Sequence, residues 1–128
     1  MAAMTTEEHK EQRPTPAPGL AAAQAARLVC TSAPDEATAH RLARDLVQAR
    51  LAACVQCVPG ATSIYRWENA VEEAREVLLS IKTRQEQLEA IAAYLAREHP
   101  YDLPELVVLT PESLGAEYLA WLLAETET

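Results

Sequence analysis

One stretch decides the fold: Arg27-Leu28-Val29-Cys30-Thr31-Ser32-Ala33-Pro34-Asp35-Glu36, in which a strand pattern changes directly into a helix start. The first six residues form a short apolar run, which predicts a buried strand. Pro34 suits a first helical turn, and the acidic residues after it favour the positive end of a helix dipole. We therefore expect a strand followed at once by a helix that ends near Arg50.

The chain after this helix predicts two strand segments, residues 52–67 and 71–83, and a second helix. Residues 52–58 and 61–67 are apolar or rich in strand formers, and residues 71–83 alternate between apolar and polar side chains. Glu68-Asn69-Ala70 predicts a hairpin turn. Thr83-Arg84-Gln85-Glu86 matches a capping box, so we expect a helix that starts there and ends before Pro100. A strand over residues 105–110 and a helix carrying Tyr118, Leu119, Trp121 and Leu122 complete the chain.

This order of elements predicts an α+β fold. Two βαβ units packed side by side give a ferredoxin-like βαββαβ sandwich, with one antiparallel sheet, helices on one face and an extra C-terminal helix. The other face of the sheet has no cover. Because the strands are apolar, that face predicts self-association as a dimer or trimer.

The first 26 residues differ from the rest in composition. They contain a charged stretch followed by Pro14-Thr15-Pro16-Ala17-Pro18-Gly19, and prolines at alternate positions do not allow a helix. We expect residues 1–26 to be a disordered Pro/Ala-rich tail and residues 27–128 to form one folded domain. A helical fray around 21–25 is the alternative for the end of the tail.

Composition excludes several classes of function. The formal net charge of −8 opposes nucleic-acid binding, and no run of about 18 apolar residues is present that could cross a membrane. Three cysteines in 128 residues favour a reducing, cytoplasmic compartment. The motifs of phosphate cradles, serine hydrolases and zinc proteases are missing, so we expect no catalytic residues and no organic cofactor.

Cysteine and histidine are the candidates for chemistry. Cys54-Val55-Gln56-Cys57 has the spacing of a redox dithiol, but in a strand the two side chains point to opposite faces, which favours two small core residues. Cys30 alone is more often a core residue than a ligand. His99 has two interpretations: a helix-terminal residue that interacts with the dipole, or a ligand for a soft metal.

Several motifs resemble the CutA divalent-cation tolerance family. They are residues 28–36, Arg50-Leu51-Ala52-Ala53-Cys54-Val55, residues 58–68, Ile81-Lys82-Thr83, His99-Pro100-Tyr101-Asp102-Leu103-Pro104-Glu105 and residues 118–122. The resemblance covers roughly Arg27 to Ala124. It implies a ferredoxin-like subunit in a tight homotrimer, similar in architecture to PII signalling proteins, with a role in tolerance of or stress response to divalent cations.

Site residues follow from the resemblance. It implies Cu(II) or another divalent cation as the ligand, with Cys30 and His99 as the principal donors and Cys54 as a third candidate. Some family members have a second histidine where this chain has Glu98, a harder ligand. The resemblance also implies a small-molecule cleft between subunits, near Trp67, Lys82, Tyr101, Glu105 and Trp121. Lysine beside aromatic rings would favour an anion there, and the alternative is that these residues anchor the trimer.

Two functional hypotheses remain open at this point. The first is a non-enzymatic, metal-binding tolerance protein. The second is a PII-like signalling or structural trimer whose clefts hold a small ligand or a partner. A dithiol oxidoreductase that uses Cys54 and Cys57 is a weaker third.

Overall fold

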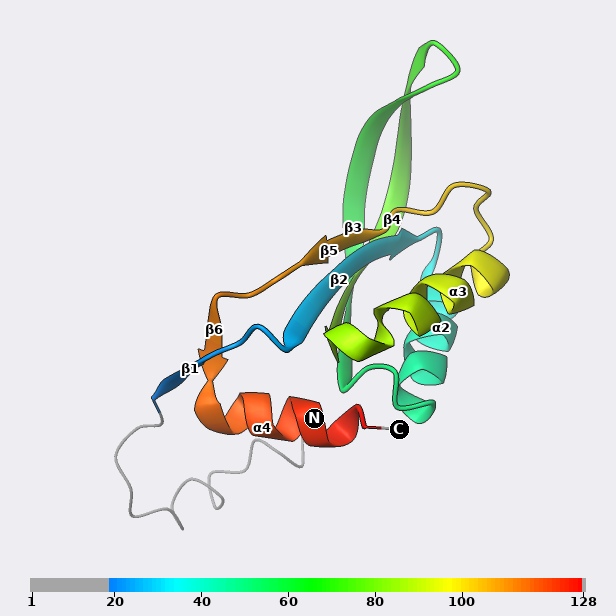
Figure 1. Ribbon diagram of the computed structural model, residues 1–128. Coiled ribbons are helices and arrows are strands. Elements are labelled where there is room, and N and C mark those ends of the chain that lie inside the picture. Colours follow the sequence, from blue (N-terminus) through cyan, green and yellow to red (C-terminus); the bar gives the residue numbers. More distant parts are fainter. Residues whose placement is uncertain (1–18, 128) are drawn as a thin grey trace.

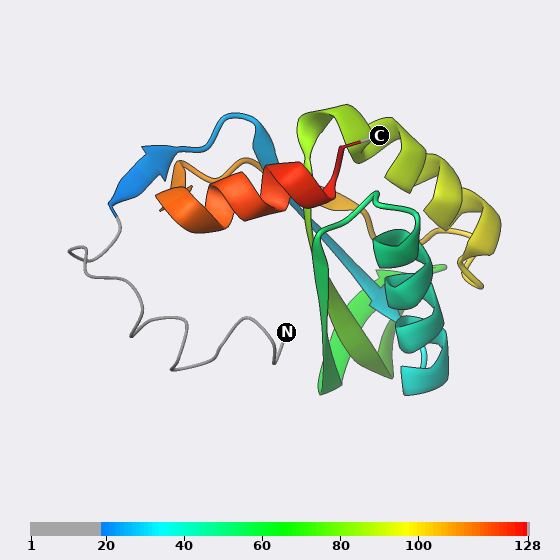
Figure 2. The ribbon, with the colours of Figure 1, turned by 90° about the horizontal axis from the view of Figure 1, so that it is seen from below.

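The computed structural model describes residues 19–127 and consists of a sheet with two helices on one face and a third helix at its end (Figures 1 and 2). The elements in chain order are β1 (Leu20–Ala22), β2 (Ala26–Ala33), α2 (Glu36–Gln48), β3 (Cys54–Trp67), β4 (Ala70–Arg84), the 3-10 turn η2 (Gln85–Gln87), α3 (Leu88–Glu98), β5 (Val107–Leu109), β6 (Ser113–Gly115) and α4 (Ala116–Glu125).

The main sheet has the strand order β3-β4-β2-β5, and every neighbouring pair is antiparallel. With α2 and α3 as the two crossovers, this is the predicted ferredoxin-like arrangement. Alternation along β2 and β4 places Val29, Ala33, Val77, Leu79 and Ile81 under the helices, where all five are buried. The opposite face has no helix over most of its area, and we call it the open face (Figure 2).

α2 begins where the sequence predicts. Asp35 is the N-cap, and its carboxylate accepts a hydrogen bond from the Thr38 backbone N–H over 2.7 Å, which lowers the pKa of Asp35 below its usual range. Ala39, Leu42 and Leu46 form the buried face of the helix. Val47, next to Leu46 in the sequence, is 41% exposed.

The capping box expected at residues 83–86 is absent. Thr83 belongs to β4, and its hydroxyl donates to the Leu51 carbonyl over 2.6 Å instead of capping a helix. η2 follows, and α3 starts only at Leu88. The prediction was wrong because Thr83 is 0% exposed, and its hydroxyl donates to a backbone carbonyl 32 residues earlier in the chain.

The β3–β4 hairpin extends well beyond the rest of the sheet (Figure 1). Its turn is at Glu68 and Asn69, which both have positive φ, as expected for the two-residue turn that joins twisted strands. A one-residue bulge interrupts β3 between Val58 and Ala61. Gly60 lies in this bulge at φ 88°, a conformation that glycine adopts without steric cost.

The end of the predicted tail is structured. β1 pairs with β6 in register from Leu20–Gly115 to Ala22–Ser113, and Ala23 and Ala26 are buried against α4. Residues 19–26 are therefore not disordered, because a strand near the C-terminus supplies their hydrogen bonds. The rest of the predicted tail, residues 1–18, lies outside the described residues.

Candidate functional site

A carboxylate on the open face is the centre of a cluster of hydrogen-bonded polar side chains. Glu76 lies on β4, and its side chain accepts hydrogen bonds from the hydroxyls of Ser63 (2.5 Å), Ser32 (3.2 Å) and Tyr101 (2.9 Å). These donors come from β3, β2 and the loop after α3. Glu76 thus joins three segments that are far apart in the sequence.

Hydrogen bonding decides the ionisation of Glu76. Burial raises its pKa, but the hydrogen bonds from Ser63, Tyr101 and Ser32 outweigh burial and leave the pKa below the ordinary 4.5. The pKa of Tyr101 changes in the opposite direction. Burial first, and then the hydrogen bond to Glu76, raise it to about 12. The pair is therefore a carboxylate and a neutral phenol at neutral pH.

His99 holds the loop that carries Tyr101. The imidazole is 7% exposed, its Nε2 lies 2.6 Å from the Ser32 carbonyl oxygen, and its Nδ1 accepts the Tyr101 backbone N–H over 3.1 Å. Because Nδ1 is an acceptor, Nε2 carries the proton and donates it to Ser32. Both ring nitrogens are therefore occupied within the chain.

A cavity of about 660 Å³ opens beside Glu76. Its walls are the upper β3–β4 hairpin and the loop after α3. The lining residues are Ser32, Ser63, Tyr65, Arg66, Trp67, Glu76, Pro100, Tyr101, Asp102, Leu103, Pro104 and Glu105. Trp67, Tyr101 and Glu105 of the predicted cleft are therefore brought together here.

The other two predicted cleft residues lie elsewhere. Lys82 is in register with Cys54 and Leu28 toward the far end of β4, and its ammonium donates to the Gln56 side chain over 2.6 Å. Trp121 is on α4, where its ring lies 5.5 Å from that of Tyr118. Within one chain, the cation expected to attract an anion is absent from the cavity.

The predicted metal donors do not converge within one chain. Cys30 is partly buried on β2, and Glu98 forms ion pairs with Arg41 at 3.2 Å and Arg97 at 3.3 Å. Among residues 19–127, no group of three or more histidine, cysteine or acidic side chains is close enough to hold a metal ion.

The two cysteines of the C-x-x-C motif lie on different faces of β3. The Cys57 thiol is directed at the Ala39 carbonyl of α2 over 3.9 Å, and burial raises its pKa. Cys54 is buried, and it lies close to Tyr118 of α4. The pKa of Tyr118 is raised, first by the burial of Tyr118 itself and to a smaller extent by Cys54. All three cysteines are free thiols, and this geometry agrees with the structural interpretation of the motif.

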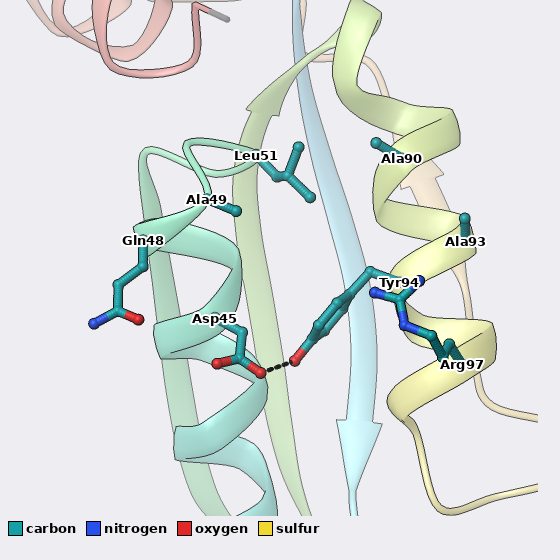
Figure 3. Close-up of a pocket in the computed structure, with 8 residues that line it drawn as sticks. All are labelled: Asp45, Gln48, Ala49, Leu51, Ala90, Ala93, Tyr94 and Arg97. Carbon is teal, nitrogen blue, oxygen red and sulfur yellow. Dashed lines mark hydrogen bonds between the residues drawn. The ribbon is translucent and has the colours of Figure 1, made fainter.

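A second cavity, of about 700 Å³, lies between α2 and α3 (Figure 3). Three of its eight lining residues are alanines, namely Ala49, Ala90 and Ala93. The Tyr94 hydroxyl of α3 donates a hydrogen bond to the Asp45 carboxylate of α2 over 2.5 Å, so these two groups are partners. Gln48 and Arg97 are the other polar residues in the lining.

The family model of the CutA1 divalent ion tolerance protein matches residues 27–125. The chain belongs to this family. A relative from Pectobacterium atrosepticum, named divalent-cation tolerance protein CutA, is 46% identical over 95 residues, which cover 74% of this chain and 86% of the relative.

Solved structures of the family have the same fold. CutA from Synechococcus elongatus superposes with a TM-score of 0.82 at 39% identity, covering 85% of this chain and 96% of that one. A second structure of the Synechococcus protein, in complex with a Bis-Tris molecule, gives a TM-score of 0.78 at 40% identity and covers 84% and 99% of the two chains. In the described part of this chain, no helix is long and apolar enough to span a bilayer.

The cluster around Glu76 was not predicted from the sequence. Ser32, Ser63 and Glu76 are ordinary residues in strand patterns, and no motif connects them. One signal was available: Glu76 directly precedes the apolar alternation that starts at Val77, so the pattern places its charge on the open face of the sheet.

Proposed function

We propose that this protein is a homotrimeric, non-enzymatic, cytoplasmic protein that binds divalent cations, copper among them, in the tolerance of or response to metal ions. Membership of the divalent ion tolerance family is the observation that carries the proposal. Three features of the chain support its parts: the apolar open face, an unpaired edge strand and thiols suited to a soft cation.

The open face and the edge strand β5 support self-association. Val58, Leu78, Val107 and Leu109 are between 42% and 54% exposed although they lie on strands. β5 pairs with β2 on one side only, so its other edge is left for a further strand. Apolar strands with open edges are unfavourable in water and favour pairing with another chain.

The proposed ion site uses residues from more than one subunit, because a single chain does not bring the donors together. Cys30 lies on β2 opposite Val107 of the edge strand, next to the surface that association would cover. His99 would bind through Nδ1 only after releasing the Tyr101 N–H. Glu98 and Cys54 remain as further donors in this proposal.

Calorimetric titration of the reduced protein with copper, in moderate salt, tests the metal site. We expect saturable binding that is lost in Cys30→Ser and in His99→Ala and kept in Cys57→Ser, whose thiol lies on the helix side of the sheet. Weak binding that salt abolishes, equal in all variants, would mean that the acidic surface attracts cations without a defined site.

Sedimentation equilibrium tests the trimer independently of the metal. We expect a mass three times 14.0 kDa. Replacement of Val107 and Leu109 by lysine, on the proposed contact strand, should shift the mass toward that of one chain. A protein that sediments as a monomer before any substitution would contradict the proposal.

The alternative function is a PII-like signalling or structural trimer that binds a small ligand in clefts between subunits. The cavity beside Glu76 favours it, because this cavity unites three of the five predicted cleft residues. The solved complex of the Synechococcus relative with Bis-Tris is a second support. Ligand binding that survives Cys30→Ser and requires Trp67 would favour this alternative over the metal site.

A further inference from the structure

The cavity beside Glu76 has a definite chemical character, and the inference drawn from it rests on the alternative function above. Its lining includes three carboxylates, those of Glu76, Asp102 and Glu105. Arg66 is the one cationic residue in the lining, and alternation along β3 directs its side chain to the other face of the hairpin from Tyr65 and Trp67. The cavity is therefore negatively charged.

Glu76 is held as an acceptor for a further donor. Ser63 occupies one carboxylate oxygen, while Ser32 and Tyr101 share the other. A carboxylate has about four acceptor positions, so one stays available after these three bonds. The three donors also fix the position of the group, which lowers the entropic cost of binding a ligand there.

Aromatic rings form part of the wall. Ser63, Tyr65 and Trp67 alternate along β3 on the same face as Glu76, which is paired with Ala61. Tyr65 is 44% exposed and Trp67 is 46% exposed, so much of each side chain is accessible. An aromatic face attracts cations, above all when they carry organic substituents and are weakly hydrated.

We propose that this cavity binds a small organic amine in its protonated form. The ammonium group donates to Glu76 and lies near the rings of Tyr65 and Trp67, and the carbon chain packs on Leu103 and Pro104. A bare divalent ion fits less well, because no three acidic, histidine or cysteine side chains among residues 19–127 approach one point. The volume of about 660 Å³ also suits a molecule rather than an ion.

Calorimetry of the assembled, full-length protein with 1,4-diaminobutane as probe tests this proposal. Two probes of similar length serve as controls: the neutral 1,4-butanediol and the anionic succinate. Glu76→Gln removes the charge with little change in shape, and Glu73→Gln removes the same charge from the other face of β4. Trp67→Leu removes a ring without touching the Glu76 hydrogen bonds.

We expect saturable binding of the diamine, at least tenfold weaker with Glu76→Gln and several-fold weaker with Trp67→Leu, and unchanged with Glu73→Gln. Butanediol and succinate should not bind. Equal weakening by both glutamine variants, or no diamine binding at all, would overturn the proposal. Binding of succinate at a site that needs Trp67 would overturn the proposed preference for a cation, while the alternative function of ligand binding in a cleft would stand. If no probe binds to a confirmed trimer, both the amine proposal and the alternative function lose their support.

Discussion

His99 donates from Nε2 to the carbonyl oxygen of Ser32 over 2.6 Å and so fastens the end of α3 to the end of β2, across 67 residues of sequence. The same ring accepts the Tyr101 N–H at Nδ1 and lies 4.9 Å, centroid to centroid, from the Tyr101 ring. One imidazole therefore sets the path of the loop that brings the Tyr101 hydroxyl to Glu76.

The first prediction concerns this fastening. His99→Ala leaves the Ser32 carbonyl and the Tyr101 N–H without their partners, so it should destabilise the fold by about 2 kcal/mol. His40→Ala, at an exposed position of α2, should change stability by less than about 0.5 kcal/mol. Urea unfolding measures both. Equal stabilities of the two variants would show that the hydrogen bonds of His99 contribute nothing.

The second prediction concerns acid stability. The pKa of Glu76 is lower in the folded protein than its ordinary 4.5, so this carboxylate stabilises the fold above that pH. The contribution is lost as the pH falls through the lowered pKa of the folded state. In Glu76→Gln, the unfolding free energy should therefore decline less between pH 5 and pH 3, a window of about two units around the ordinary carboxyl pKa. Glu73→Gln should keep the decline of the parent protein.

The third prediction concerns the contact between α2 and α3. Burial first, and then the hydrogen bond to Asp45, raise the pKa of Tyr94. A raised phenol pKa means that stability is complete below the ordinary value of 10.0 and is lost as the pH rises above it. Tyr94→Phe should cost about 1 kcal/mol at neutral pH and flatten the alkaline decline.

A double-mutant cycle of Tyr94→Phe with Asp45→Asn isolates this pair. We expect a coupling free energy of about 0.5 kcal/mol or more, since the two side chains are in direct contact. Tyr94→Phe with Glu89→Gln, which changes an exposed charge on the same helix, should be additive. A coupling of zero for the first pair would contradict the assigned hydrogen bond.

The fourth prediction concerns the end of α4. Buried Gln87 donates to the Thr126 carbonyl over 2.7 Å, and Arg84 and Arg50 donate to the carbonyls of Leu123 and Ala124. These bonds satisfy acceptors that a helix end leaves open. Gln87→Ala should cost about 1–2 kcal/mol and accelerate hydrogen exchange in α4 more than in β4. Gln85→Ala, an exposed neighbour, should change neither.

Much of the fold could be predicted because local patterns determine it. The strand at Arg27, the helix capped by Asp35 and the turn at Glu68 and Asn69 each depend on residues close in sequence. The errors at residues 19–26 and at Thr83 have a common cause in contacts over long sequence distances. β1 exists because β6, more than 90 residues later, pairs with it, and Thr83 caps no helix because it bonds to Leu51.

The cleft could be predicted only in part, because its residues are brought together by strand pairing over long sequence distances. The resemblance grouped Lys82 with Trp67 and Tyr101, but Lys82 lies twelve positions along β4 from Ala70, the register partner of Trp67. A strand rises about 3.3 Å per residue, so positions this far apart on one strand cannot share a small cavity. Glu76, which does lie at the cavity, is recognised only when the pairing of β3, β4 and β2 is known.

The bulge between Val58 and Ala61 gives β3 one residue that has no partner of its own on β4. Because Pro59 and Gly60 of β3 oppose the single residue Val77 of β4, Ser63, Tyr65 and Trp67 lie on the same face as Cys54 and Gln56. Deleting Gly60 would remove the bulge and leave Ala61 opposite Glu76, so Ser63, Tyr65 and Trp67 would stay on the open face. The hairpin would lose only the local bend and extra twist that a bulge produces. The hairpin can thus lose one residue at this bulge without changing the surface that it presents beside Glu76.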